Sequence, residues 1–145
     1  MQVKDCMHTD VVTVTPETLV STADQVMRDR NIRHLPVVTE QHVLVGVLTD
    51  RDVRRAEASD APPMAQHELT YLLDRLCVQD IMTPQVVTVR STTPIVEAGQ
   101  IFLQKKFGCL PVVRDDNTLA GIITVTDLLR AYVAQHATGR ESPCK

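Results

Sequence analysis

Two heptapeptides, GVLTDRD at residues 46–52 and GIITVTD at residues 121–127, share one pattern: glycine, two branched apolar residues, threonine, two variable residues and aspartate. They lie 75 residues apart, and the same offset aligns residues 3–56 with residues 78–131 without a gap. Of the 54 aligned positions, 20 are identical. A gapless match of this length does not arise from composition, so the chain is a tandem duplication.

Each repeat predicts the element order β-α-β-β-α. The β-branched run VVTV, at residues 11–14 and 86–89, is typical of a strand. Apolar residues at helical spacing then predict a helix, capped by Thr18 in the first repeat and by Thr93, with Pro94 as first helical residue, in the second. LPVV, a polar turn and the heptapeptide predict two more strands, and a second helix starts near the motif aspartate. Apolar strands covered by helices favour an α/β (α+β) fold.

A linker lies between the two predicted repeats, and a tail follows the second. We predict a first repeat over residues 1–60, a linker with an amphipathic helix over 61–77, a second repeat over 78–137 and a flexible tail over 138–145. Pro62-Pro63 cannot lie inside a helix. The leucine stripe that follows has i, i+3, i+4, i+7 spacing and consists of Leu69, Leu72, Leu73 and Leu76. We expect this stripe to pack on the repeats or on a partner.

Composition excludes several classes of protein. The net charge of −3 offers no general attraction to phosphate backbones, so nucleic-acid binding is not expected. No apolar run is long enough to span a bilayer, and the N-terminus lacks the apolar core of a signal peptide. We therefore expect a cytoplasmic protein without membrane partners.

No motif for catalysis or metal binding is visible. The four cysteines are widely spaced without a Cys-x-x-Cys pair, and the five histidines lack metal-ligand spacing. There is no Gly-x-Ser-x-Gly elbow, His-Glu-x-x-His motif or Walker phosphate loop. We therefore expect neither an enzyme nor an obligatory cofactor or metal, and we interpret the cysteines as buried or incidental thiols.

The tandem blocks VKDCM/VQDIM, LPVV and Gly-h-h-Thr-x-x-Asp, where h is apolar, resemble a pair of CBS domains, named after cystathionine β-synthase. The resemblance covers residues 1–137 and is strongest to small bacterial CBS-pair proteins of the acetoin-utilisation type. It implies two repeats around a pseudo-twofold axis, with sheets face to face, helices outside and two clefts. In that family the clefts hold AMP, ADP, ATP, NAD or S-adenosylmethionine, and the pairs form homodimers that regulate another protein.

The Thr-x-x-Asp pattern has two interpretations. As a structural motif it caps a helix: the threonine accepts from free amides, and the acid complements the helix dipole. The resemblance implies a second role, in which Asp52 and Asp127 hold ribose while Thr49 and Thr124 face phosphate. A carboxylate can accept both ribose hydroxyls, and a helix N-terminus offers donors to phosphate. Capping and binding are compatible.

The resemblance also implies an aliphatic slot for adenine. The residues expected to line it are Val11, Val12, Thr13 and Pro36 in the first repeat and Val86, Val87, Thr88 and Pro111 in the second. The chain has no Trp, two Phe and two Tyr, which agrees with a slot between aliphatic side chains.

The two clefts are expected to differ in charge. Candidate phosphate ligands in the first repeat are Arg33, His34 and Arg51, which the second repeat replaces by Gly108, Cys109 and Thr126. The alternative for Arg33 and His34 is a solvated start of a strand. Packing around the twofold could instead bring either of them to the neighbouring cleft. We expect phosphate-rich ligands to prefer the cleft built on Thr49 and Asp52.

Two functional hypotheses follow. The first is a regulatory module that senses an adenosine nucleotide and relays binding through its dimer to an unidentified protein. The second is a constitutive homodimeric scaffold with empty or vestigial clefts. Gly46 and Gly121 lie inside predicted strands under either hypothesis. Glycine inside a strand costs stability unless something approaches the backbone closely, and their recurrence before threonine is compatible with such an approach.

Overall fold

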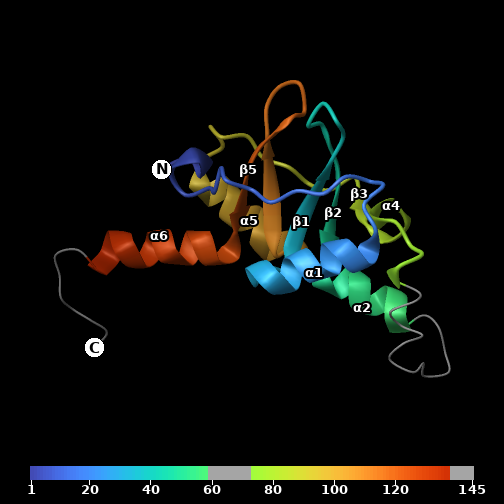
Figure 1. The fold of residues 1–145 in the computed structure, drawn as a ribbon. Helices are drawn as coiled ribbons and strands as arrows, with labels where there is room; N and C mark the ends of the chain where they lie inside the picture. Colours follow the sequence, from blue (N-terminus) through green and yellow to red (C-terminus); the bar gives the residue numbers. More distant parts are fainter. Residues whose placement is uncertain (59–72, 138–145) are drawn as a thin grey trace. The chain divides into compact units, whose positions relative to one another are not determined.

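The computed structural model describes residues 1–58 and 73–137 (Figure 1). A 3-10 helix at Val3–Asp5 precedes the helices α1 (Val20–Arg30), α2 (Asp50–Ala58), α4 (Val78–Ile81), α5 (Ile95–Lys105) and α6 (Val125–Ala137). The strands are β1 (His34–Val38), β2 (Leu44–Thr49), β3 (Thr83–Pro84), β4 (Cys109–Val113) and β5 (Leu119–Thr124). The predicted α/β class is confirmed.

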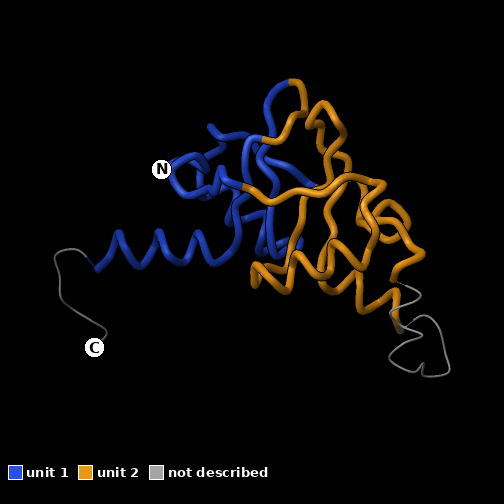
Figure 2. Tube along the Cα trace, viewed as in Figure 1, with its two compact units in different colours: residues 1–10, 87–115, 120–145 blue, residues 11–86, 116–119 orange. Residues whose placement is uncertain are grey.

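The chain forms two compact units that do not coincide with the two sequence repeats (Figure 2). Unit 1 contains Met1–Asp10, Val87–Asp115 and the chain from Ala120 onward, and unit 2 contains Val11–Val86 and Asp116–Leu119. We call residues 3–10 the first leading segment and residues 78–85 the second. The first leading segment belongs to the unit that carries the second repeat's strands, and the second belongs to the unit that carries the first repeat's strands.

Unit 2 is built on a three-stranded antiparallel sheet in the order β1-β2-β3. The register places His34 opposite Thr49, and Val47 opposite Thr83 of the second leading segment. Helices α1 and α2 pack against each other and against these strands. Leu73 and Leu76 of the predicted leucine stripe join the core of this unit. The other two leucines of the stripe, and most of the predicted linker, lie outside the described residues.

Unit 1 repeats the plan with strands β4 and β5. Its core contains Val3 from the 3-10 helix, Ala98 and Phe102 from α5, and Ile123 from β5. The first leading segment runs beside β5, because the backbone N–H and C=O of His8 each form a 2.9 Å hydrogen bond with Ile122. Helix α5 packs against α6.

Two sequence predictions need correction. Each VVTV run contributes a single bridge residue instead of a strand: Val14 pairs in parallel with Val37, and Val89 with Val112. The predicted caps at Thr18 and Thr93 are also wrong. Leu19 and Pro94 precede α1 and α5 without a side-chain cap bond.

The reason for the missing caps is a competing local turn. The hydroxyl of Thr18 accepts the backbone N–H of Thr15 at 3.1 Å, and that of Thr93 accepts the N–H of Arg90 at 3.0 Å. Threonine hydroxyls often bond to backbone groups in the preceding turn instead of the helix.

Within residues 1–58 and 73–137, no helix combines the length and apolar character needed to cross a membrane. The same residues contain no cluster of three potential metal-binding side chains. Cys6, Cys77 and Cys109 are free thiols, and burial raises the pKa of Cys109 to about 12. Cys144 lies outside the described residues.

Candidate functional site

Asp52 is the centre of a reciprocal hydrogen-bonded box at the junction of β2 and α2. The backbone N–H of Thr49 donates to Asp52 Oδ2 at 3.0 Å, and the N–H of Asp52 donates to Thr49 Oγ1 at 3.0 Å. The box satisfies two amides near the start of α2, as a capping box does. Asp52 is buried, with an exposed fraction of 7%. The predicted capping role is therefore observed in the first repeat.

The other contacts of the Asp52 carboxylate are long. Thr83 of the second leading segment approaches with its hydroxyl at 3.4 Å from both Oδ1 and Oδ2, and Arg55 Nη1 lies 3.9 Å from Oδ1. These distances exceed the usual 2.5–3.0 Å of an O–H···O bond, and the ion pair with exposed Arg55 is weak. Among the residues that the structure describes, Oδ1 thus has no short hydrogen bond, and it can accept from a ligand hydroxyl.

Asp127 forms the same box in unit 1 and then differs. The N–H of Thr124 donates to Asp127 Oδ2 at 2.9 Å, and the N–H of Asp127 donates to Thr124 Oγ1 at 3.2 Å. The remaining oxygen, Oδ1, is 2.7 Å from His8 Nε2 and 3.0 Å from Arg130 Nη1. Both oxygens of Asp127 therefore have short partners.

His34 lies beside the Asp52 box. It pairs across the sheet with Thr49, and the N–H of Asp50 donates to the carbonyl of Arg33 at 3.1 Å. Burial is the main cause that lowers the pKa of His34; the positive charge of Arg33 adds to this, and Asp50 opposes it. The imidazole is therefore neutral at pH 7.

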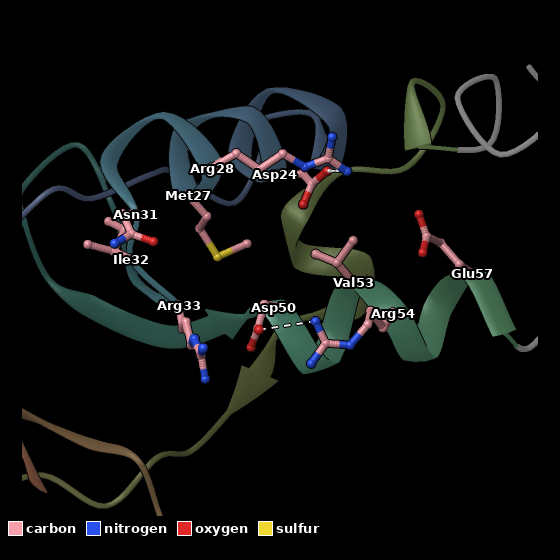
Figure 3. A pocket seen from close by; sticks show the side chains of 10 residues that line it. All are labelled: Asp24, Met27, Arg28, Asn31, Ile32, Arg33, Asp50, Val53, Arg54 and Glu57. Atoms are coloured by element: carbon pink, nitrogen blue, oxygen red, sulfur yellow. Dashed lines mark hydrogen bonds and ion pairs between the residues drawn. The ribbon is translucent and has the colours of Figure 1, made fainter. Parts of the chain in front are cut away.

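Arg33 lines a cavity of about 380 Å³ between α1 and α2 (Figure 3). Its neighbours there include two ion pairs, Arg28 with Asp24 at 2.8 Å and Arg54 with Asp50 at 3.1 Å. Three arginines and three acids line this cavity, so it has no net charge that would favour phosphate. Arg51 is exposed on the first turn of α2.

The adenine-slot residues of the first repeat lie together in unit 2. The N–H of Val14 donates to the carbonyl of Pro36 at 3.1 Å, and the N–H of Val38 donates to the carbonyl of Val14 at 2.9 Å. Pro36 is fully buried, while Val11, Val12 and Thr13 are half-buried.

The slot residues of the second repeat divide between the units. Val87, Thr88 and Pro111 belong to unit 1, whereas Val86 belongs to unit 2. The N–H of Val89 donates to the carbonyl of Pro111 at 3.0 Å, which repeats the bond made by Val14.

Sequence reasoning missed four side chains beside the two aspartates. His8 and Thr83 occupy equivalent positions at the 75-residue offset, and so do Arg55 and Arg130. The offset was a usable signal, because both members of each pair contact the motif aspartate of a unit. What it did not indicate was that each leading segment reaches the aspartate of the other repeat.

The close approach expected at the two strand glycines is confirmed. A Cβ on Gly46 would lie 2.8 Å from both the carbonyl oxygen of Thr83 and Met82 Sδ. A Cβ on Gly121 would lie 2.5 Å from the carbonyl oxygen of His8. The glycines let the leading segments, with His8 and Thr83, lie directly against β5 and β2.

Comparison with known sequences identifies relatives of two kinds. The family model of the CBS domain matches residues 3–59 and 78–134. The CBS domain-containing protein YhcV of Bacillus subtilis is 31% identical over 140 residues, covering 94% of this chain and 89% of the relative. The inosine-5'-monophosphate dehydrogenase of Methanocaldococcus jannaschii is 35% identical over 121 residues, covering 83% of this chain. The chain spans only 21% of that enzyme's length.

Solved structures with similar folds include complexes with adenosine compounds. CBSX2 from Arabidopsis thaliana, solved with AMP, has a TM-score of 0.78 at 31% identity, over 92% of this chain and 97% of that one. The domain pair of protein MJ0100, solved with 5'-methylthioadenosine and S-adenosyl-L-methionine, has a TM-score of 0.77 at 26% identity, over 91% and 99%. A protein from Vibrio cholerae assigned to acetoin utilization (AcuB) has a TM-score of 0.80 at 26% identity, over 99% of this chain and 98% of that one.

Proposed function

The chain belongs to the CBS domain family, and from this premise we propose that it is a regulatory module whose Asp52 site binds an adenosine nucleotide. The resemblance predicted from the repeats is confirmed, including the likeness to AcuB. The observation that carries the proposal is the buried Asp52 carboxylate. Thr49 fixes one of its oxygens, and the other has no short partner within residues 1–58 and 73–137. Structural relatives bind AMP, 5'-methylthioadenosine or S-adenosylmethionine.

Each part of a nucleotide has a proposed partner in unit 2. Asp52 accepts the ribose hydroxyls, and the aliphatic residues Val11, Val12, Thr13 and Pro36 contain the adenine ring. Thr49 and His34, which are neighbours across β1 and β2, face the phosphate. Arg33 and Arg51 are secondary phosphate candidates, since Arg33 lines the α1–α2 cavity and Arg51 is exposed. The ligands we favour are AMP, ADP and ATP, ahead of NAD and S-adenosylmethionine.

The proposed homodimer surface is the apolar face of α5 and α6. Large apolar side chains are exposed on these two helices: Val96, Leu103, Val125, Leu129, Tyr132 and Val133. On α6 they recur at i, i+4, i+7 and i+8, which places them on one face. An exposed apolar face of this kind marks an interaction site, and a second copy of the chain can cover it. We propose that ligand binding is relayed through this dimer to a regulated protein.

Native mass spectrometry of the full chain, combined with thermal unfolding, tests both parts of the proposal. We expect a dimer that retains or takes up an adenosine nucleotide. At a ligand concentration about 100 times the dissociation constant, the free energy of unfolding should rise by about 2.7 kcal/mol. If AMP, ADP, ATP, NAD and S-adenosylmethionine all leave the unfolding midpoint unchanged at millimolar concentration, the scaffold hypothesis replaces the sensor.

The role of His34 predicts a pH dependence. Burial lowers the pKa of His34 in the free protein, and a bound phosphate would raise it again by favouring the imidazolium. The complex then holds more protons than the free protein, so AMP affinity should rise as the pH falls from 7.5 to 5.5. We expect a gain of about threefold to tenfold, on the order of 1 kcal/mol, in wild type relative to His34→Gln.

The protonation of AMP itself affects the measured affinity of wild type and of His34→Gln equally, so it cancels in the comparison of the two proteins. Adenosine, which lacks phosphate, should show no such difference, and His42→Gln provides a matched control at an exposed histidine. Equal pH profiles for wild type and His34→Gln would remove His34 from the phosphate site.

A further inference from the structure

The two motif aspartates differ in what the leading segment presents to them. The second leading segment presents Thr83 to Asp52, and the first presents His8 to Asp127. The arginines that lie three residues after each aspartate occupy equivalent positions but make different contacts: Arg130 Nη1 is 3.0 Å from Asp127 Oδ1, whereas Arg55 Nη1 is 3.9 Å from Asp52 Oδ1. Histidine in place of threonine is the difference in residue type between the two carboxylate environments.

His8 is held in place by the backbone. Its N–H and C=O both bond to Ile122, and the missing Cβ of Gly121 lets this segment lie against β5. The imidazole then meets Asp127 Oδ1 at 2.7 Å. A carboxylate only accepts, so Nε2 carries the hydrogen and donates. A hydrogen bond to a carboxylate of this kind is shorter and stronger than one between neutral groups.

Both carboxylate oxygens of Asp127 already accept short hydrogen bonds, unlike those of Asp52. Its side chain is 2% exposed, Oδ2 accepts from Thr124, and Oδ1 accepts from both His8 and Arg130. At Asp52 the equivalent hydroxyl of Thr83 lies 3.4 Å away. Its hydrogen can rotate away from Asp52, because a hydroxyl can also accept a hydrogen bond. A ribose diol can therefore replace the weak contact at Asp52 but must displace a short bond at Asp127.

We propose that His8 binds the Asp127 carboxylate in the place of a ligand's ribose and thereby restricts nucleotide binding to Asp52. The inference rests on the proposed function, because it assumes that these carboxylates recognise ribose. His8 is a specificity-determining residue of the chain, and its side chain is 57% exposed, so it can leave Asp127 without unfolding β5.

Isothermal titration calorimetry with AMP on the full chain tests the proposal. Wild type should bind one AMP per chain. His8→Thr copies the residue found at position 83 and keeps the backbone bonds to Ile122, so it should bind two. The affinity of Asp127 for AMP should rise at least about tenfold, because the bond from His8 is gone and only that of the exposed Arg130 remains on Oδ1.

Three variants serve as controls. Adding Asp127→Asn to His8→Thr should return the count to one AMP per chain. Thr83→His should place an imidazole at Asp52 and lower the affinity of that site. His8→Ala removes the imidazole by a second route, and a thermal unfolding curve for each variant shows that it is folded.

The outcomes separate this inference from the proposed function. One AMP per chain in wild type, His8→Thr and His8→Ala overturns the role of His8 and leaves the Asp52 site intact. Two AMP in wild type also overturns it. No AMP in wild type but one in His8→Thr, removed by Asp127→Asn, refutes the Asp52 site and supports His8. No AMP in any protein overturns both.

Discussion

Asp52→Asn is expected to lower the affinity for AMP by about 100-fold, which corresponds to roughly 2.7 kcal/mol of binding free energy. The carboxylate accepts from two ribose hydroxyls, and hydrogen bonds to a charged group contribute about 1.5–3 kcal/mol each. An amide has one acceptor atom, and that atom is needed for the 3.0 Å bond from the N–H of Thr49. The folded state should change little, because the box around Thr49 can persist. Calorimetry for AMP and thermal unfolding measure the two effects separately.

Two variants calibrate this result. Asp52→Ala should lose AMP binding and also about 1 kcal/mol of folding free energy, because it removes the capping acceptor. Asp127→Asn makes the same change in the equivalent box of the other unit. In an otherwise wild-type chain it should leave the affinity for AMP unchanged. If Asp127→Asn weakens binding as much as Asp52→Asn does, the two sites are equivalent and the preference for Asp52 is wrong.

The local chemistry of the heptapeptides could be predicted from sequence. Thr-x-x-Asp has one low-energy arrangement at the start of a helix, and Thr49–Asp52 and Thr124–Asp127 both adopt it. The strands at LPVV and at the glycine-containing stretch also formed as predicted, because they are apolar runs bounded by polar turns. Short-range signals of this kind depend only on neighbours in the chain.

The exchange of leading segments could not be predicted in the same way. VKDCM and VQDIM present similar residues, so either segment fits either repeat on the basis of pattern alone. The contacts that decide the pairing join distant residues, such as His8 with Asp127 and Thr83 with Asp52. A pattern with a period of 75 residues identifies equivalent positions but not which copy completes which unit.

The structure adds a second difference between the two sites to the one predicted from sequence. The sequence pointed to Arg33, His34 and Arg51 as the source of the asymmetry. Arg33 lines a cavity of balanced charge, and Arg51 is exposed. At the carboxylates themselves the residue type differs at His8 and Thr83, which lie 75 residues apart and reach different repeats. His34 lies opposite Thr49 across the sheet, and its role as a phosphate contact stays a prediction.

Gly121→Ala is expected to lower the free energy of unfolding by about 3 kcal/mol, at the upper end of overpacking effects. The new Cβ would lie 2.5 Å from the carbonyl oxygen of His8. This oxygen is backbone and accepts from Ile122, so it cannot rotate away as a side chain would. Relief requires the first leading segment to separate from β5. The thermal midpoint should fall by roughly 10 °C for a chain of this length.

Gly99→Ala is the matched control, because the same methyl group is added where there is room. The Cβ would meet Leu128 Cδ1 at 3.7 Å, an ordinary contact, and Gly99 lies inside helix α5. Alanine is favoured over glycine in a helix by about 1 kcal/mol, so this variant should be more stable than wild type. Opposite signs for the two substitutions would show that the leading segment is held against β5 by a backbone contact. Equal effects would contradict that packing and, with it, the fixed position of His8 beside Asp127.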